Sequence, residues 1–296
     1  MKILICDAFD AGLPERLKVY GEVTEDKKNL PDAHIALVRS KTQCDKTWFD
    51  QAKQLKMVIR GGVGMDNIDV EYAKQKGVIA LNTPEASSIS VAELAMALMI
   101  ALPNKIIPGH QGMSQNKWLK KECERTELYG KTLGLIGAGR IAREVAIRAK
   151  AFGMKIIAYD PSFRQSDFAE IKASLEEIWK ESDYISLHVP LTESTKEIIN
   201  KNTIAKMKDG VIIINTARGK CVVEQDIADA LKSGKIGGYG NDVWYNDPPA
   251  SSPLIGAPNT ILTPHIGASS NENLLRISDI IVEKIKEFVS QKSSCC

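Results

Sequence analysis

The chain of 296 residues lacks the features that mark several large classes of protein. None of its six cysteines forms a C-x-x-C pair, so the sequence indicates neither a disulfide framework nor a zinc site. The net charge is only +2, which gives no concentrated basic face for nucleic-acid phosphates. The longest apolar stretch, residues 91–102, contains Glu93 and is shorter than the roughly 20 residues of a membrane span. We therefore expect a cytoplasmic protein with no metal, nucleic-acid or membrane partner.

The two ends of the chain carry no clear targeting signal. The apolar run that opens the sequence stops at Asp7 and is too short for a signal peptide. The terminal pair Cys295 and Cys296 lacks the C-a-a-X arrangement of a prenylation site, and we interpret it as a frayed, reactive tail. We expect no regulatory domain after the final helix.

Length and patterning predict two α/β domains. The chain is long for one hydrophobic core, and its 44% hydrophobic and 26% charged residues are typical of globular proteins. Short β-branched runs alternate with longer helical stretches, which is typical of parallel sheets with crossover helices. The expected strands are residues 3–6, 35–38, 57–59, 78–81, 132–136, 155–159, 184–189, 211–215, 238–243 and 260–262. The predicted fold class is therefore α/β, with two doubly wound parallel-sheet domains.

A polar segment, residues 82–88, separates the two predicted domains. Ser90 and Glu93 then form a capping-box pattern, which predicts a helix with Ser90 at its N-cap. We further expect helices over residues 70–76, 141–152, 224–233 and 271–289.

A glycine-rich loop predicts a dinucleotide site. Gly137, Gly139 and Ala142 follow an expected strand, open an expected helix and fit the pattern G-x-G-x-x-G/A. The first glycine makes the tight turn, and the second lets the backbone approach a pyrophosphate at the helix N-terminus. Asp160 lies 21 residues after Gly139, where an acid accepts hydrogen bonds from the adenosine ribose. A carboxylate there repels a 2′-phosphate, which favours NAD over NADP.

Three later loops follow expected strands and carry an arginine, carboxylates and a histidine. They contain Arg218, residues 241–249 and His265. Loops at the carboxyl ends of parallel strands line the ligand crevice of such sheets. Hydride transfer from an alcohol needs a base such as histidine, a carboxylate to orient it and an arginine to hold a substrate carboxylate.

With these motifs in place, the sequence resembles the D-isomer-specific 2-hydroxyacid dehydrogenases from end to end. The resemblance rests on residues 64–69 (GMDNID), 130–141 (GKTLGLIGAGRI), 215–219 (NTARG) and 264–267 (PHIG). It implies a Rossmann NAD-binding domain, residues 91–268, inserted into a flavodoxin-like substrate domain, residues 1–90 and 269–296. It also implies a dimerisation arm at about 100–128, around Trp118, and therefore a homodimer.

The resemblance assigns roles to individual residues. Arg218 would bind the substrate carboxylate, His265 would be the acid/base and Asp247 would orient His265. The family usually carries Glu at the position of Asp247, and the shorter Asp would reach His265 through a backbone adjustment or a water. The cofactor residues are expected to be Gly137, Gly139, Arg140, Ile141, Asp160, His188, Pro190, Thr195, Thr216, Ala217, Asp242, Gly267 and Ala268. The substrate residues are expected to be Arg39, Ser40, Arg60, Val63 and Gly64.

Two arginines favour a phosphorylated hydroxy acid as the substrate. Arg39 follows an expected strand, and Arg60 precedes the loop at residues 61–64 whose amides would meet the substrate carboxylate. Together they suit a phosphate, because guanidinium groups offer forked donors. Within the family, the chain therefore looks most like the 3-phosphoglycerate dehydrogenases of serine synthesis. A glyoxylate or hydroxypyruvate reductase is the alternative within the same class, and an NAD(H)-sensing, corepressor-like binding protein is an alternative outside it.

Overall fold

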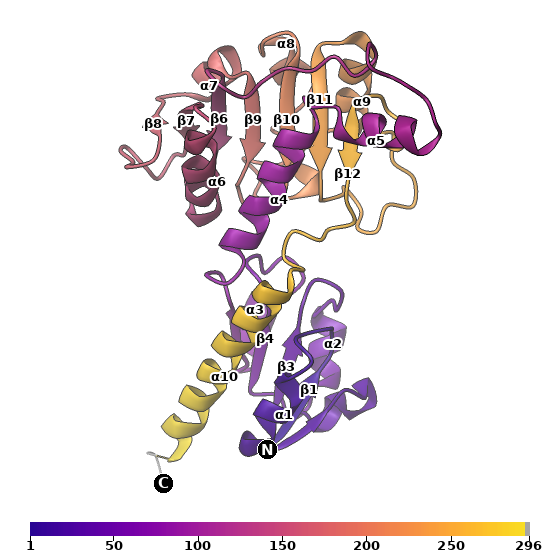
Figure 1. The fold of residues 1–296 in the computed structure, drawn as a ribbon. Helices are drawn as coiled ribbons and strands as arrows, with labels where there is room; N and C mark the ends of the chain where they lie inside the picture. The colour runs from indigo at the N-terminus through magenta and orange to yellow at the C-terminus, as the bar shows by residue number, and fades with distance from the viewer. Residues whose placement is uncertain (294–296) are drawn as a thin grey trace. The chain divides into compact units, whose positions relative to one another are not determined.

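The computed structural model describes residues 1–293, so Cys295 and Cys296 lie outside the described residues. The chain divides into two compact units. Unit 1 consists of Met1–Ser87 and the chain from Ala268 onward, and unit 2 is the intervening segment Ser88–Gly267 (Figure 1). Unit 2 is thus inserted into unit 1, because the last helix of the chain returns to the unit that the first strand began.

Unit 1 is built on a wholly parallel sheet of five strands in the order β2-β1-β3-β4-β5. This order is the one found in flavodoxin-like folds. Its strands are β1 (Lys2–Ile5), β2 (Glu22–Thr24), β3 (Ile35–Val38), β4 (Met57–Arg60) and β5 (Ile79–Asn82). Its α-helices are α1 (Leu13–Leu17), α2 (Lys46–Gln51), α3 (Val70–Gln75) and α10 (Asn271–Ser293).

Each face of the unit 1 sheet has its own core, because successive residues of a strand point to opposite faces. One core contains Leu4 together with Phe49 of α2, and the other contains the neighbouring Ile3 and residues of α10. From α10 come Ile277, Ile281 and Ile285, which are fully buried and spaced four residues apart, as one stripe of a helix. Burial of each isoleucine contributes about 1.5–3 kcal/mol, so α10 is an integral part of unit 1.

Unit 2 is built on a wholly parallel sheet of seven strands in the order β12-β11-β10-β9-β6-β7-β8. Its strands are β6 (Thr132–Ile136), β7 (Lys155–Tyr159), β8 (Glu170–Ile171), β9 (Tyr184–Leu187), β10 (Val211–Asn215), β11 (Ile236–Asn241) and β12 (Thr260–Leu262). The order runs in one direction from β6 to β8 and in the other from β9 to β12. The direction therefore reverses between β6 and β9, which is the topological switch point where a doubly wound sheet binds its ligand.

Helices cover both faces of the unit 2 sheet. The helices of unit 2 are α4 (Ser88–Ala101), α5 (Ile106–Ser114), α6 (Arg140–Ala151), α7 (Leu175–Glu181), α8 (Lys201–Ala205) and α9 (Glu224–Ser233), and all but α5 pack on the sheet. One core joins α4 and α6 to the sheet, and the other joins α7, α8 and α9 to it. The two doubly wound parallel-sheet domains predicted from the sequence are confirmed.

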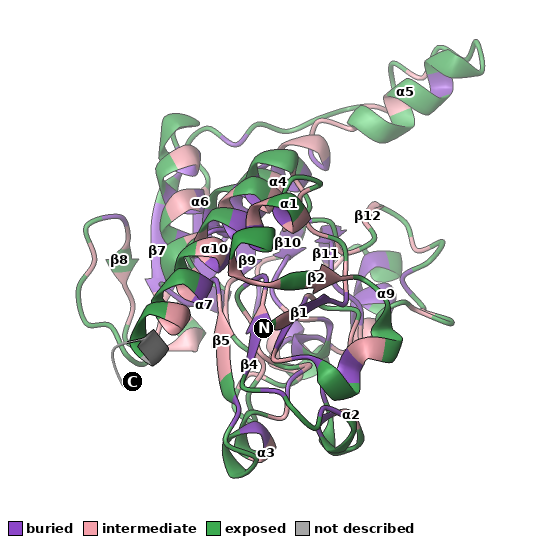
Figure 2. Ribbon diagram, turned by 90° about the horizontal axis from the view of Figure 1, so that it is seen from below, coloured by how far each residue is buried: buried purple, intermediate pink, exposed green. Residues whose placement is uncertain are grey.

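Helix α5 stands apart from the sheet of its own unit, and Figure 2 shows it at the end of an extended connection. Its exposed residues include Ile106 and Met113, and Trp118 just beyond it is 76% exposed. Among the described residues no single helix is long and apolar enough to cross a membrane. Within these residues, only α4 and α5 together have the length and apolar composition of a membrane span, and their axes are bent by 66° at the break between them.

Several sequence-based expectations about local structure are wrong in detail. The expected strand at 3–6 lies one residue earlier, and that at 184–189 ends two residues earlier. Ser90 is not an N-cap, because α4 begins at Ser88 and the Ser90 hydroxyl donates to the carbonyl of Gly267 at 2.6 Å. The expected strand at 78–81 lies one residue later, and that at 238–243 lies two residues earlier. Strands β2 and β8 were not predicted, because both are short and have no buried apolar run.

Candidate active site

The glycine loop of unit 2 joins β6 to α6 at the switch point. Gly137 has φ of 96°, and a Cβ there would lie 2.5 Å from the carbonyl oxygen of His188, so only glycine fits. Gly139 is the N-cap of α6, and a Cβ built on it would meet nothing within 4 Å. The space over Gly139 is therefore open at the N-terminus of a twelve-residue helix, where backbone N–H groups favour an anion.

Asp160 links the end of β7 to this loop. Its carboxylate accepts hydrogen bonds from the backbone N–H groups of Ala138 and Ser162, both at 2.9 Å. Because each carboxylate oxygen has two acceptor positions, both retain capacity for ribose hydroxyls. The open space at Gly139, the helix N-terminus and this carboxylate together fit an NAD molecule.

His188 follows β9 beside the glycine loop. Its Nε2 lies 2.9 Å from the Ser186 hydroxyl. Desolvation lowers the pKa of His188 from its ordinary value to about 3, although part of the side chain retains exposed surface. The imidazole is consequently neutral near pH 7 and is poorly suited to exchanging protons with a substrate.

The other predicted cofactor residues lie on the same carboxyl edge of the unit 2 sheet, except Ala268, which belongs to unit 1. Arg140 and Ile141 open α6, while Pro190 is exposed and its carbonyl accepts from Thr195 Oγ1 at 2.6 Å. Ala217 is buried, and its N–H donates to Asn215 Oδ1. The Thr216 hydroxyl is buried and has no hydrogen-bond partner within residues 1–293, which is the condition expected of an atom that awaits a ligand.

Arg218 lies in a tight loop after β10. Asn215 braces this loop, because its side-chain amide donates to the carbonyl of Arg218 at 3.1 Å. Arg218 Nη1 donates to the carbonyl of Ala217 at 2.6 Å. The next residue, Gly219, packs against the segment after β11, where an added Cβ would lie 1.9 Å from the carbonyl carbon of Trp244. The arginine loop is therefore locked against the loop that carries Asp247.

Asp242 organises the loop that carries His265. It is 1% exposed, and its carboxylate accepts from the N–H groups of Ile266 and Gly267, both at 2.8 Å, and from the Thr263 hydroxyl at 2.6 Å. His265 has φ of 56°, a left-handed conformation that is uncommon outside glycine. The bonds to the two following amides stabilise this turn, so the structure gives Asp242 a role that the sequence did not predict.

Asp247 and His265 are in direct contact. Asp247 Oδ2 accepts from Nδ1 of His265, and both side chains remain partly exposed. This bond assigns the proton to Nδ1 and leaves Nε2 as the nitrogen that can accept a proton. The shorter acid therefore reaches the imidazole without a bridging water.

Two further side chains hold these loops and were missed from the sequence. Glu224, the first residue of α9, accepts from the N–H of Tyr245 at 3.0 Å and from the Ser252 hydroxyl at 2.7 Å. The Trp244 indole donates to the carbonyl of Thr263 at 3.1 Å. An acid at the start of a helix indicates only a favourable helix terminus, so no sequence signal pointed to the contact of Glu224 with a distant loop.

In unit 1, Arg39 follows β3 and is held by the structure around it. Its backbone N–H donates to Asp7 at 2.6 Å, and its guanidinium donates to the carbonyls of Ala8 and Ala268 at 3.3 and 2.9 Å. Burial lowers the pKa of Arg39 from its ordinary value, while Asp7 acts in the opposite direction. Asp7 was not predicted as a site residue, and its only sequence signal is its place after β1, the second strand in the order of the sheet.

Arg60 ends β4 at the carboxyl edge of the unit 1 sheet, in register with Val38, the residue before Arg39. Its guanidinium lies against the loop at 61–64, since a Cβ added to Gly62 would fall 1.9 Å from Arg60 Nη1. The same loop exposes the predicted substrate residues Val63 and, in part, Gly64, while Ser40 next to Arg39 is also exposed.

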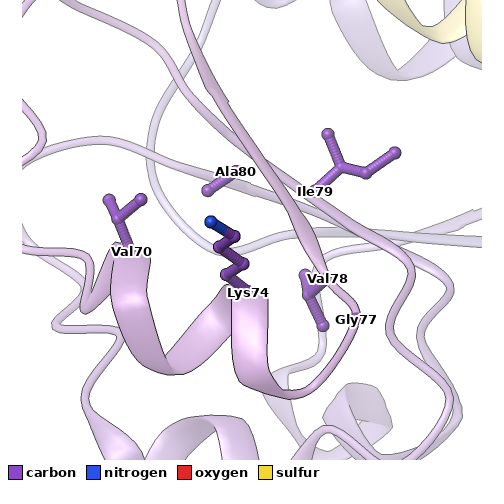
Figure 3. A pocket seen from close by; sticks show the side chains of 6 residues that line it. All are labelled: Val70, Lys74, Gly77, Val78, Ile79 and Ala80. Atoms are coloured by element: carbon purple, nitrogen blue, oxygen red, sulfur yellow. The ribbon is translucent and has the colours of Figure 1, made fainter.

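A separate cavity of about 390 Å³ opens between α3 and β5 of unit 1 (Figure 3). Its lining is mostly apolar, and the amine of Lys74 points toward Ala80 across it. None of the predicted site residues lines it. Among the described residues, no group of three or more His, Cys, Asp and Glu side chains is placed to hold a metal ion.

Comparison with known proteins gives matches over both units. The family model for the D-isomer specific 2-hydroxyacid dehydrogenase, NAD binding domain, matches residues 96–267. The chain is 48% identical over 277 residues to a hydroxypyruvate reductase of Thermotoga maritima, covering 92% of this chain and 90% of that protein. It is 42% identical over 301 residues to a D-3-phosphoglycerate dehydrogenase of Methanocaldococcus jannaschii, covering 98% of this chain but only 57% of that protein. A crystal structure of D-lactate dehydrogenase from Aquifex aeolicus, complexed with NAD and lactic acid, is similar with a TM-score of 0.88 and 30% identity over 99% of this chain and 96% of that chain.

Proposed function

Because the chain belongs to the D-isomer-specific 2-hydroxyacid dehydrogenase family, we propose that it oxidises 3-phosphoglycerate to 3-phosphohydroxypyruvate with NAD, a reaction of serine synthesis. Family membership confirms the predicted class, an NAD-dependent oxidoreductase acting on CH–OH donors, and the predicted cofactor. The choice of this substrate within the family is the proposal.

The catalytic step follows from the contacts in unit 2. Gly139 and Asp160 would hold NAD, which would supply the acceptor for the hydride from C2 of the hydroxy acid. His265 accepts the hydroxyl proton at Nε2, since its Nδ1 is held by Asp247. The Asp247 carboxylate stabilises the imidazolium that this transfer produces. Arg218 binds the substrate carboxylate, which fixes C2 relative to His265.

One observation supports a phosphorylated substrate. Arg60 places its guanidinium against the loop at 61–64, and Arg39 follows the neighbouring strand at the same edge of the sheet. Two guanidinium groups at neighbouring strand ends attract a dianionic phosphate more strongly than a neutral hydroxyl. Part of the donor capacity of Arg39 is used by the carbonyls of Ala8 and Ala268.

A hydroxypyruvate or glyoxylate reductase is the second candidate. The Thermotoga relative supports it, since it is named for hydroxypyruvate and matches over 90% of its own length, whereas the chain spans only 57% of the phosphoglycerate dehydrogenase. The engagement of Arg39 with backbone carbonyls also favours a substrate that needs only one cation.

Steady-state kinetics on the full chain distinguish the two candidates. We expect kcat/KM with 3-phosphohydroxypyruvate to exceed that with hydroxypyruvate or glyoxylate. Arg60→Ala is expected to reduce the value for the phosphorylated substrate by about 10- to 100-fold, the effect of losing a charged hydrogen bond, and to spare the others. Lys74→Ala removes one positive charge from the cavity of Figure 3 and is the matched control. An equal loss on all substrates would contradict a phosphate site, and tight NADH binding without turnover on any of them would favour the corepressor-like alternative.

The arm around α5 supports the homodimer that we also propose. Gly109, Met113, Trp118, Leu119, Lys120 and Cys123 line a mostly apolar hollow of about 440 Å³ there. Exposed apolar surface of this kind marks association sites. Light scattering after size exclusion should give twice the mass of the 32.5 kDa chain, and Trp118→Ser should lower it. A wild-type chain that elutes as a monomer at micromolar concentration would refute the dimer. The cytoplasmic location stays a prediction.

A further inference from the structure

The segment that carries Asp247 has little structure of its own. It runs from Tyr245 to Ser252, between β11 and β12, and contains no helix or strand. Most of it is exposed, and Pro248 and Pro249 have no N–H with which to anchor it. The direction of Asp247 toward His265 must therefore be set by contacts at the ends of the segment.

A single carboxylate binds both ends. Glu224 Oε1 accepts the backbone N–H of Tyr245 at 3.0 Å, and Oε2 accepts the hydroxyl of Ser252 at 2.7 Å. Hydrogen bonds to an ionised acceptor are about twice as strong as neutral ones. The two bonds close the segment into a loop and remove much of its conformational freedom.

The support for Glu224 is rigid and is shared with Arg218. Glu224 is the first residue of α9, whose Ile227 and Leu231 are buried in the core of unit 2. It lies six residues after Arg218, and the intervening Gly219 packs directly against the backbone ahead of Tyr245. One carboxylate thus fixes the Asp247 loop to the element that follows the arginine loop.

We propose that Glu224 is a positioning residue for the Asp247–His265 pair. It touches neither substrate nor cofactor and acts by holding both ends of the 245–252 loop, so that Asp247 meets Nδ1 of His265. This inference rests on the proposed function only in assigning the acid/base role to His265.

The test compares Glu224→Ala with two variants of the same helix turn. Asp226→Ala removes another carboxylate from the first turn of α9 and also loses a backbone bond, from Lys201 N–H at 2.7 Å, but does not touch the 245–252 loop. Glu224→Gln keeps an acceptor for Tyr245 and a donor for Ser252. We expect Glu224→Ala to lower kcat by about 10- to 100-fold, as a misplaced catalytic group does, and both other variants to stay within about threefold of wild type.

The pH profile separates positioning from general support of the fold. If Glu224 acts through the Asp247–His265 pair, Glu224→Ala should change the pH profile of kcat/KM in the same way as Asp247→Asn does. Asp226→Ala should leave that profile unchanged. Ser252→Ala releases only one end of the loop and should give a smaller shift, which keeps the test available if Glu224→Ala does not fold.

A double-mutant cycle completes the test. If Glu224 acts through Asp247, Glu224→Ala should have almost no further effect on kcat in an Asp247→Asn background. Additive losses, or an Asp226→Ala variant as impaired as Glu224→Ala, would overturn the positioning role and leave the proposed reaction intact. If Asp247→Asn and His265→Gln themselves leave activity and its pH profile unchanged, the proposed catalytic roles fail instead.

Discussion

The carboxylate of Asp247 is hydrogen-bonded directly to Nδ1 of His265, although it is one methylene shorter than the glutamate usual at this position in the family. Asp242 holds the amides that follow His265, and Trp244 donates to the carbonyl of Thr263 just before it. The two loops that carry the acid and the imidazole are thus brought together by contacts outside the pair.

The first prediction concerns this pair. Asp247→Asn should lower kcat for oxidation by about 10- to 100-fold, because a charged hydrogen bond to the imidazolium is worth about 1.5–3 kcal/mol. Asp247→Glu keeps the charge but adds a methylene group to a side chain that already contacts His265. We therefore expect it to retain more activity than Asp247→Asn and less than wild type. Stopped-flow NADH absorbance measures both. A variant Asp247→Asn with wild-type kcat would contradict a catalytic contact.

The two glycines of the β6–α6 loop should respond differently to alanine. Gly137→Ala adds a Cβ 2.5 Å from a carbonyl oxygen at φ of 96°, so the free energy of unfolding should fall by about 1–3 kcal/mol. Gly139→Ala adds a Cβ in open space at φ of −77° and should leave that free energy nearly unchanged. Its effect should be on the Kd for NADH, which we expect to rise at least tenfold because the methyl group occupies the pyrophosphate position.

Urea unfolding and NADH fluorescence titration, applied to both glycine variants, check this pair of expectations. A Gly139→Ala protein that binds NADH as tightly as wild type would place the pyrophosphate elsewhere.

Asp160 should determine the choice between NAD and NADP. Asp160→Ser keeps an acceptor for the amide of Ala138 but removes the charge that repels a 2′-phosphate. We expect the ratio of kcat/KM for NAD over NADP to fall by about tenfold or more, with KM for NAD rising. Asp167→Ser removes a carboxylate of the neighbouring loop, paired with Arg143 at 2.6 Å, and should leave the ratio unchanged. If wild type and Asp160→Ser had the same ratio of kcat/KM for NAD over NADP, a group other than Asp160 would distinguish the two riboses.

His188 makes the stability of the fold depend on pH. Its pKa of about 3 lies below the roughly 6.5 of an unfolded histidine. Between these values the unfolded chain binds a proton that the native chain does not, so stability falls as pH decreases through this window, by at most about 1.4 kcal/mol per pH unit. His188→Gln should reduce the slope of unfolding free energy against pH from 4.5 to 6.5, whereas His110→Gln, at an exposed site, should not. Identical slopes in wild type and His188→Gln would show that protonation of His188 is not coupled to unfolding.

Much of the fold could be predicted because the central strands of both sheets are buried on both faces. β3, β6, β7 and β10 have the predicted bounds, since runs such as Val211–Asn215 have no polar face to confuse the pattern. The edge strand β12 also has its predicted bounds, but two other edge strands, β2 and β8, were not predicted. Both are short and have no buried residue, and they form strands only because their backbones pair with a neighbouring strand, β1 for Glu22–Thr24 and β7 for Glu170–Ile171.

The loops of the candidate site could be predicted from the sequence, but the side-chain contacts that hold these loops in place could not. Residues after strands, such as Arg218 and His265, stand out because parallel strands deliver them to one edge. The hydrogen-bond partner of Ser90 lies 177 residues away in the sequence. The backbone amides bound by Asp242 lie 24 and 25 residues away, and the two partners of Glu224 lie 21 and 28 residues away. No local sequence pattern can reveal such distant contacts. Ser90 is instructive, since its local pattern matched a helix cap while its hydroxyl serves a tertiary contact.

The position of α10 has a consequence for biosynthesis. Ile277, Ile281 and Ile285 complete one core of unit 1, yet they are translated only after the whole of unit 2. A nascent chain can therefore bury the interior of the inserted unit while the sheet made first still exposes one apolar face on the ribosome. The N-terminal strands cannot complete this core until α10 has been synthesised. We expect chaperones to bind their exposed apolar surface during synthesis.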